Sequence, residues 1–154
     1  MLFRSGIDYR SIAIDSVKKV ESGSKKLYRF VIKHQKDGVR VEMLPKSNDM
    51  VITVIGDNVL SANIMLRNVG DYIGIDNTVS DPSKALDSKI GYIKKTMNIN
   101  DVALIISQIK DISLIYVKSQ DEEALPTWKY EIGDYVFFIN AINGEIENYT
   151  MRKI

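Results

Sequence analysis

The side chains most often used in catalysis are few in this sequence and widely spaced. His34 is the single histidine, and the chain of 154 residues contains no cysteine. A Ser–His–Asp mechanism would have to use His34, but no nucleophile-elbow pattern accompanies it. One histidine without any cysteine also gives a poor ligand set for a transition metal. We therefore interpret His34 as a surface residue and expect no metal site.

A run of acidic residues, Asp121, Glu122 and Glu123, comes closest to a catalytic group. A glycosidase-type mechanism needs two carboxyl groups held a few ångströms apart in a cleft, one of them with a raised pKa. Adjacent acids between two predicted strands are more simply a solvated turn. The sequence also lacks a glycine-rich phosphate loop. We expect no enzymatic activity and no cofactor, and keep a carboxylate-dependent hydrolase as a third hypothesis.

The charge balance argues against a nucleic-acid partner. Lys and Arg number 21 against 20 Asp and Glu, a formal net charge of +1, so no bulk field attracts nucleic acid or anionic lipid. No apolar run reaches membrane-spanning length, and residues 1–8 lack the apolar stretch of a signal peptide. We expect membrane association only through an N-terminal anchor that precedes this sequence. The basic residues form scattered pairs: Lys18-Lys19, Lys25-Lys26 and Lys94-Lys95.

The first half of the chain predicts a β-meander. In "KLYRFVIKH", Tyr28, Phe30 and Ile32 alternate with polar or mixed positions, and Asp37-Gly38 is a two-residue hairpin signal. The stretch "DMVITVIGDNVLSANIML" repeats this design around Gly56, Asp57 and Asn58. The segments "YRSIAIDSVKKVESG" and "GDYIGID" favour further strands.

The second half predicts two helices followed by four strands. The first helix opens with Ser80 or Asp81 as a capping residue and Pro82 in its first turn. A shorter second helix, "NINDVALIISQIK", is expected to be capped by Asn98 or Asn100. The four strand candidates are "ISLIYVKS", "TWKYEI", "YVFFINA" and "EIENYTMRKI".

Strands, then helices, then strands predict an α+β fold. We expect one domain, residues 1–154, with a β-meander over 1–78, and helices followed by a C-terminal β-hairpin region over 79–154. Its sheet is expected to be antiparallel and curved like a half-barrel, with the two amphipathic helices packed on one face.

Aromatic residues gather between Trp128 and Tyr149. In "YVFFINA" both faces of the strand are largely apolar. Such a strand is either central in a covered sheet or presents one face to a partner. We select as the partner-binding patch Trp128, Tyr130, Tyr135 and Phe138, with Tyr149 and Met151 behind them.

The segment "LPTWKYEIGDYVFFINAINGEIEN" resembles the closing hairpin of PepSY-type domains and of the related C-terminal domain of YycI-type regulators. Pro126 and Trp128 match the P-x-W element, residues 135–138 the aromatic strand, and residues 140–146 the ending. Asn143-Gly144 would supply the positive φ angles of a tight hairpin turn. The resemblance implies an extracytoplasmic domain that binds and restrains a protease or sensor kinase.

The first half resembles the strand series of LolA-type lipoprotein carriers and their spore-associated lipoprotein relatives. Tyr28, Phe30, Arg40, Glu42 and the turn at 56–58 match that pattern. This resemblance implies an extracytoplasmic, membrane-tethered protein that cradles acyl chains or binds a cell-wall enzyme. In the acyl-chain alternative, a hydrophobic half-barrel would be lined by Tyr28, Phe30, Val41, Ile52, Leu60 and Ile64.

The hypothesis that we carry forward is a non-catalytic protein of the bacterial cell envelope, anchored or of lipoprotein type. It would bind and regulate another protein, such as a cell-wall or spore-envelope enzyme or a sensor kinase, through aromatic anchors in a desolvated patch. The same patch would also allow a homodimer. Binding of lipid or acyl chains in the half-barrel is the alternative.

Overall fold

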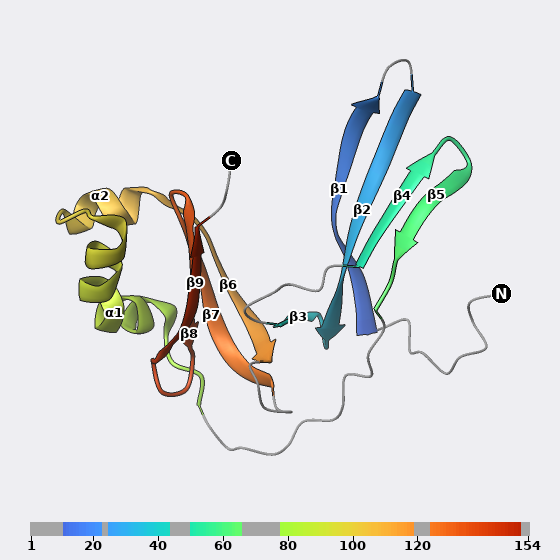
Figure 1. Ribbon diagram of the computed structural model, residues 1–154. Coiled ribbons are helices and arrows are strands. Elements are labelled where there is room, and N and C mark those ends of the chain that lie inside the picture. Colours follow the sequence, from blue (N-terminus) through green and yellow to red (C-terminus); the bar gives the residue numbers. More distant parts are fainter. Residues whose placement is uncertain (1–10, 23–24, 44–49, 66–77, 119–123, 152–154) are drawn as a thin grey trace. The chain divides into compact units, whose positions relative to one another are not determined.

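The computed structural model describes residues 11–22, 25–43, 50–65, 78–118 and 124–151. The chain divides into two compact units, Met1–Ile73 (unit 1) and Gly74–Ile154 (unit 2). Antiparallel strands dominate, two helices accompany them, and the sheet is open rather than closed (Figure 1). This arrangement is broadly consistent with the α+β class. The strand expected in "GDYIGID" lies outside the described residues.

Unit 1 is an antiparallel sheet centred on its second strand. One edge of this strand pairs with the first strand, and the opposite edge pairs with the third and fourth strands in succession. The fifth strand extends the sheet beyond the fourth. These strands are β1 (Ile12–Ser22), β2 (Lys25–Lys36), β3 (Val39–Met43), β4 (Met50–Ile55) and β5 (Asn58–Asn63).

The turns of unit 1 follow from local chemistry. Asp37 and Gly38 both have positive φ, 50° and 80°, as a two-residue hairpin with the twist of its strands requires. The predicted hairpin is thus confirmed. Register shifts interrupt β1 at Asp15 and β5 at Leu60, where one strand carries an extra residue.

One face of the unit 1 sheet is apolar. Cross-strand partners project to the same face, so Phe30 lies between Val17 and Ile52. Among the described apolar residues of unit 1, however, Met50 is the only one that is buried. The described strands of this unit therefore have no core layer of their own over that face.

Unit 2 begins with the helix α1 (Pro82–Met97), which starts where the sequence predicts. The Asp81 carboxylate accepts hydrogen bonds from the backbone N–H groups of Ser83 and Lys84, at 2.8 and 3.4 Å. The proline at the first helical position loses no hydrogen bond, because that N–H has no intrahelical partner. Asn98, with φ of 55°, ends the helix in the left-handed conformation.

The second helix, α2 (Val102–Ser107), is capped by Asp101 and not by Asn98 or Asn100. The reason is that Asn98 is already used to end α1. The Asp101 carboxylate accepts hydrogen bonds from the N–H groups of Ala103 and Leu104. The helix is also shorter than expected, because the following strand starts at Ile109.

Four antiparallel strands in chain order complete unit 2: β6 (Ile109–Lys118), β7 (Ala124–Ile132), β8 (Tyr135–Asn140) and β9 (Ile146–Met151). The tight turn expected at Asn143-Gly144 is wrong, because only Gly144 has a positive φ. Five residues connect β8 to β9 instead. The Asn140 side chain organises them by accepting hydrogen bonds from the N–H groups of Ile142 and Asn143.

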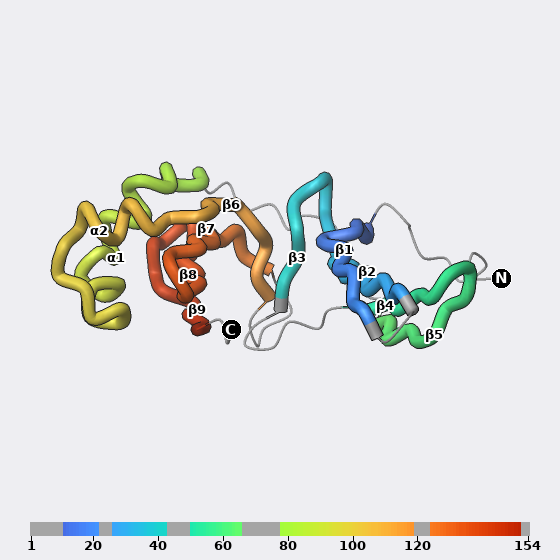
Figure 2. Tube along the Cα trace, turned by 90° about the horizontal axis from the view of Figure 1, so that it is seen from above, coloured from blue at the N-terminus to red at the C-terminus, as the bar shows by residue number. Residues whose placement is uncertain are grey.

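The core of unit 2 lies between the helices and one face of this sheet. Figures 1 and 2 both show α1 and α2 together on one side of β7, β8 and β9. The sheet contributes alternate residues of β7 and β8, as expected for a period of two. The buried core residues are Ala85, Leu86, Ile93, Ile105, Tyr130, Ile132, Phe137 and Ile139.

Candidate functional site

Two aromatic side chains of β7 attach the start of α1 to the sheet. The indole Nε1 of Trp128 donates a hydrogen bond to the backbone oxygen of Ser80 at 2.9 Å. The hydroxyl of Tyr130 donates to the backbone oxygen of Pro82 at 2.7 Å. The Ser80 N–H in turn donates to Ala141 at the end of β8. Both aromatic residues therefore position the helix layer.

The surroundings of Tyr130 favour its neutral form. The side chain has no exposed surface, and the carboxylate of the helix cap, Asp81, lies nearby. Burial first, and the charge of Asp81 second, raise the pKa of Tyr130 above its ordinary value of 10.0. The hydroxyl is thus held as a hydrogen-bond donor to the helix.

A second group of aromatic residues lies partly open to solvent where β8 and β9 meet α1. The rings of Tyr149 and Phe137 stack with centroids 6.1 Å apart, and Phe137 stacks on Tyr135 at 5.9 Å. Tyr92 of α1 meets Tyr149 edge to face at 6.0 Å. We name the β9 aromatic surface by its members, Tyr92, Tyr135, Phe137, Tyr149 and Met151.

The exposure of this surface is graded from its floor to its rim. Phe137 is fully buried, whereas Tyr92 is 41%, Tyr149 is 44% and Met151 is 62% exposed. The ring of Tyr149 stacks on the buried ring of Phe137, and Tyr92 in turn contacts Tyr149. Such pre-ordered aromatic residues lose little side-chain entropy when a partner covers them.

The β9 aromatic surface borders a strand edge. Strand β9 ends the sheet order, and its outer edge has no neighbouring strand among the described residues. An edge strand presents backbone N–H and C=O groups that can pair with another chain. Apolar rings and backbone hydrogen-bonding groups therefore lie next to each other on one side of unit 2.

The structure divides the six residues of the predicted patch among three environments. Tyr135, Tyr149 and Met151 belong to the β9 aromatic surface. Trp128 and Tyr130 lie on the same face of the sheet but attach α1. Phe138 is 4% exposed and lies on the opposite face, since its cross-strand neighbours are Lys129 and Asn148. Adjacent residues of a strand point to opposite faces, so Phe137 and Phe138 cannot serve one surface.

Tyr92 and Phe137 are the members of the β9 aromatic surface that our sequence analysis did not select, and Tyr92 comes from a different part of the chain. The apolar stripe of α1 runs through Leu86, Ile90, Ile93 and Met97, and Tyr92 stands outside it. An aromatic residue beyond the core stripe of a helix is a signal for a second contact. Its contact with Tyr149 could not be predicted, because the position of Tyr149 depends on the register of β9 against β8.

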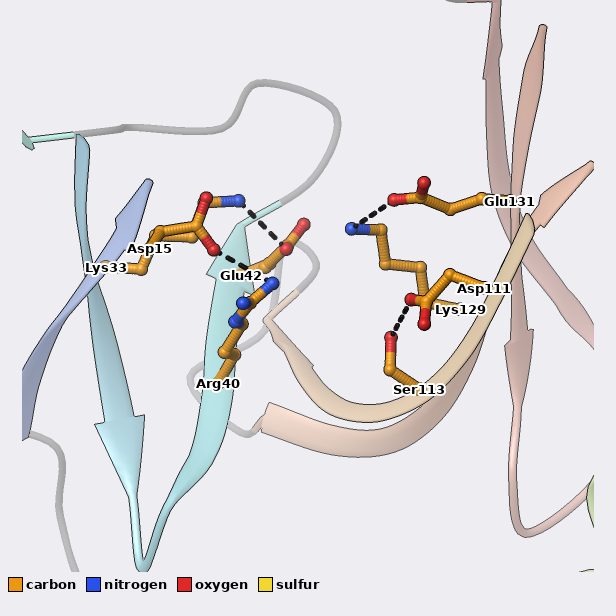
Figure 3. A network of polar contacts seen from close by, with 8 residues as sticks. All are labelled: Asp15, Lys33, Arg40, Glu42, Asp111, Ser113, Lys129 and Glu131. Carbon is orange, nitrogen blue, oxygen red and sulfur yellow. Dashed lines mark hydrogen bonds and ion pairs between the residues drawn. The ribbon is translucent and has the colours of Figure 1, made fainter. Parts of the chain in front are cut away.

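Polar side chains on other sheet faces form ion pairs and hydrogen bonds (Figure 3). In unit 2, Lys129 Nζ lies 3.2 Å from Glu131 Oε1. In unit 1, Lys33 Nζ lies 3.0 Å from Glu42 Oε1. Arg40 Nη1 approaches the buried Oδ1 of Asp15 at 2.8 Å as an ion pair, without hydrogen-bond geometry.

The described residues supply little for chemistry. They contain no group of three or more His, Asp or Glu side chains that could hold a metal ion. No helix among them is long and apolar enough to cross a membrane. The acidic run 121–123 of the hydrolase hypothesis lies outside the described residues.

Replacing Tyr130 by phenylalanine tests its attachment of α1. The variant loses one hydrogen bond within the core, and we expect the free energy of unfolding to fall by about 1 kcal/mol. Tyr149→Phe is the matched control, with an expected change within about 0.5 kcal/mol because that ring is partly exposed. Urea unfolding followed by circular dichroism measures both. Equal midpoints for the two variants would contradict the assignment.

The raised pKa of Tyr130 predicts a loss of stability in alkali. The unfolded chain releases this proton near pH 10.0 and the folded chain only at higher pH. The contribution of the protonated Tyr130 hydroxyl to the free energy of unfolding is therefore intact below pH 10.0 and declines as the pH rises above it. Urea midpoints on both sides of that value should fall more steeply for the wild type than for Tyr130→Phe. Parallel declines would refute a role for this proton.

No protein-family model, no curated protein and no solved structure matches this chain. The resemblances to PepSY-, YycI- and LolA-type proteins therefore stay predictions.

Proposed function

We propose that the protein is a non-catalytic, extracytoplasmic regulator that binds another protein through the β9 aromatic surface and the adjoining edge of β9. One observation supports this most strongly. Tyr149 and Met151 remain 44% and 62% exposed on the outermost strand of the sheet, where Tyr149 stacks on the buried ring of Phe137 and Met151 is the cross-strand partner of Tyr135. Ordered apolar residues beside an unpaired strand edge are typical of protein recognition.

The binding mode that fits this geometry is addition of a strand. An extended segment of the partner would hydrogen-bond to the backbone of β9, and its side chains would cover Tyr149 and Met151. Backbone pairing supplies affinity, while the aromatic rim selects apolar side chains at alternate positions of the incoming strand. Tyr92 would form the wall on the helix side.

The class of partner comes from the sequence resemblance alone. PepSY- and YycI-type domains restrain extracytoplasmic proteases and sensor kinases, so we propose a partner of that kind or a cell-wall or spore-envelope enzyme. The same resemblance underlies the proposed cell-envelope location and an anchor or lipid attachment upstream of this sequence.

Differential capture tests the β9 surface. The chain is immobilised and exposed to a cell-envelope fraction, as wild type and as the double variant Tyr149→Ser, Met151→Ser. We expect at least one protein to be retained by the wild type and lost by the variant. The matched control is Val102→Ser, Leu104→Ser, which removes two exposed apolar residues of α2 and should retain it.

Hydrogen exchange then locates the contact. Added partner should slow exchange at the backbone amides of β9 and leave those of β5 unchanged. Retention that is equal for wild type and both double variants, or slowing confined to β5, would exclude β9 as the docking edge. If the chain forms only a homodimer through β9 and retains no other protein, the occupant of the β9 edge is a second copy of the chain, and the proposal of a foreign partner is wrong.

A second candidate is binding of an acyl chain on the apolar face of unit 1. It is favoured by the register, which places Tyr28, Phe30 and Ile52 on one face as the alternative hypothesis requires. A curved, half-barrel-like sheet would cradle the chain there. Saturable enhancement of a fluorescent fatty-acid probe by the wild type, reduced in Tyr28→Ser, would support it. No enhancement would eliminate it.

A further inference from the structure

Both long hairpins of unit 1 turn at the same end of its sheet. Leu27, just after the turn between β1 and β2, pairs with Ile55, just before the turn between β4 and β5. In Figure 1 the adjoining ends of β1 and β2 and the turn between β4 and β5 lie on the side of this unit away from β3. We name this end the hairpin end and define it by residues 18–22, 25–29 and 54–60.

The hairpin end carries part of the exposed apolar surface of unit 1. Four large apolar side chains lie within a few residues of the two turns, with exposed fractions from 39% to 64%. Leu60 stands at the register shift of β5 and has no cross-strand partner. The exposed apolar residues are Val20, Tyr28, Val59 and Leu60.

The same end is basic although the chain as a whole is nearly neutral. The hairpin end contains five cationic and two acidic residues, a net charge of +3, in a chain with a net charge of +1. Of the two acids, Glu21 forms an exposed ion pair with Lys19 at 2.7 Å, and Asp57 lies in the turn between β4 and β5. The cationic residues are Lys18, Lys19, Lys25, Lys26 and Arg29.

The strand register sets two of these cations directly against each other. Lys18 of β1 and Arg29 of β2 are cross-strand partners, and both are exposed. Like charges at directly opposite positions of a sheet destabilise it. This pairing works against the fold of the hairpin, whereas an external anion placed between the two side chains would relieve the repulsion.

An anionic bilayer surface is complementary to three features of the hairpin end: its exposed apolar residues, its positive charge and its opposed Lys18 and Arg29. Aliphatic residues at protruding turns can enter the headgroup region, and a tyrosine is well suited to the boundary between apolar and polar layers. Lys and Arg residues near an anionic leaflet each add attraction. A single-stranded nucleic acid would fit less well, because it is bound by aromatic rings along a basic groove rather than by aliphatic tips.

We propose that the hairpin end of unit 1 docks on an anionic lipid surface. Val20, Tyr28, Val59 and Leu60 enter the interface, and Lys18, Lys19, Lys26 and Arg29 contact the headgroups. This contact is separate from the β9 aromatic surface of unit 2 and does not depend on the proposed protein partner.

Sedimentation of the full chain with lipid vesicles tests the contact. We expect binding to vesicles of phosphatidylglycerol, weak binding to vesicles of phosphatidylcholine, and a decline of the former with added salt. Absence of binding to phosphatidylglycerol vesicles at low salt would overturn the proposal. So would binding that is equal for both lipids.

Charge reversal at Lys18 separates docking from folding. Lys18→Glu faces Arg29 with an opposite charge, so thermal stability should hold or rise. Its affinity for phosphatidylglycerol vesicles should nevertheless fall by roughly tenfold. Lys84→Glu on α1 is the matched control, with the same change of net charge in unit 2 and little expected loss. Equal losses for the two variants would reduce the effect to net charge and overturn the site.

A matched pair of variants tests how much the exposed apolar residues contribute to vesicle binding. Leu60→Ser at the hairpin end should weaken vesicle binding by several-fold, whereas Leu104→Ser, a comparably exposed leucine of α2, should not. Light scattering accompanies both measurements. A wild-type dimer that Leu60→Ser converts to a monomer, together with unchanged vesicle binding, would assign this end to a second copy of the chain and overturn the lipid proposal.

Discussion

The hydrogen bonds that attach the first turn of α1 to β7 determine how unit 2 is assembled. Trp128 and Tyr130 lie two residues apart on one face of the strand, and their donors reach the backbone oxygens of Ser80 and Pro82. Because two points fix the start of the helix, its apolar stripe is directed onto β7 and β8. Tyr92, one position before the buried Ile93, is thereby brought to the ring of Tyr149. The partly exposed surface at β9 thus depends on contacts made by buried residues.

Features set by neighbouring residues could be predicted from the sequence. The start of α1 at Asp81 and Pro82, the hairpin at Asp37 and Gly38, and the alternation of β8 all follow from local chemistry. Features set by several competing groups could not. Asn98 was expected to begin one helix but ends another, and the side chain of Asn140 reshapes a turn that Asn143 and Gly144 would otherwise have made tight.

The composition of the candidate site was harder to predict than its location. Trp128, Tyr130 and Phe138 are close in sequence, but the pairing of Trp128 with Ile139 places Phe138 on the other face. A shift of one residue in that register would have reversed the outcome. The placement of charge depends on register in the same way. The basic residues near positions 18 and 25 look scattered along the chain, whereas the antiparallel register of β1 and β2 puts them on one hairpin and sets Lys18 opposite Arg29.

The long sequence separation of the helix attachment has a consequence for folding kinetics. In unit 2 each strand pairs with its neighbour in the chain, so the sheet forms through contacts that are local in sequence. The bonds from β7 to the start of α1 instead join residues 48 positions apart, and they require a larger loop to close. One of these bonds belongs to the only tryptophan of the protein. Its indole nitrogen bonds to the start of the helix layer, so its fluorescence responds to the arrival of that layer, and the chain contains a natural probe for that step.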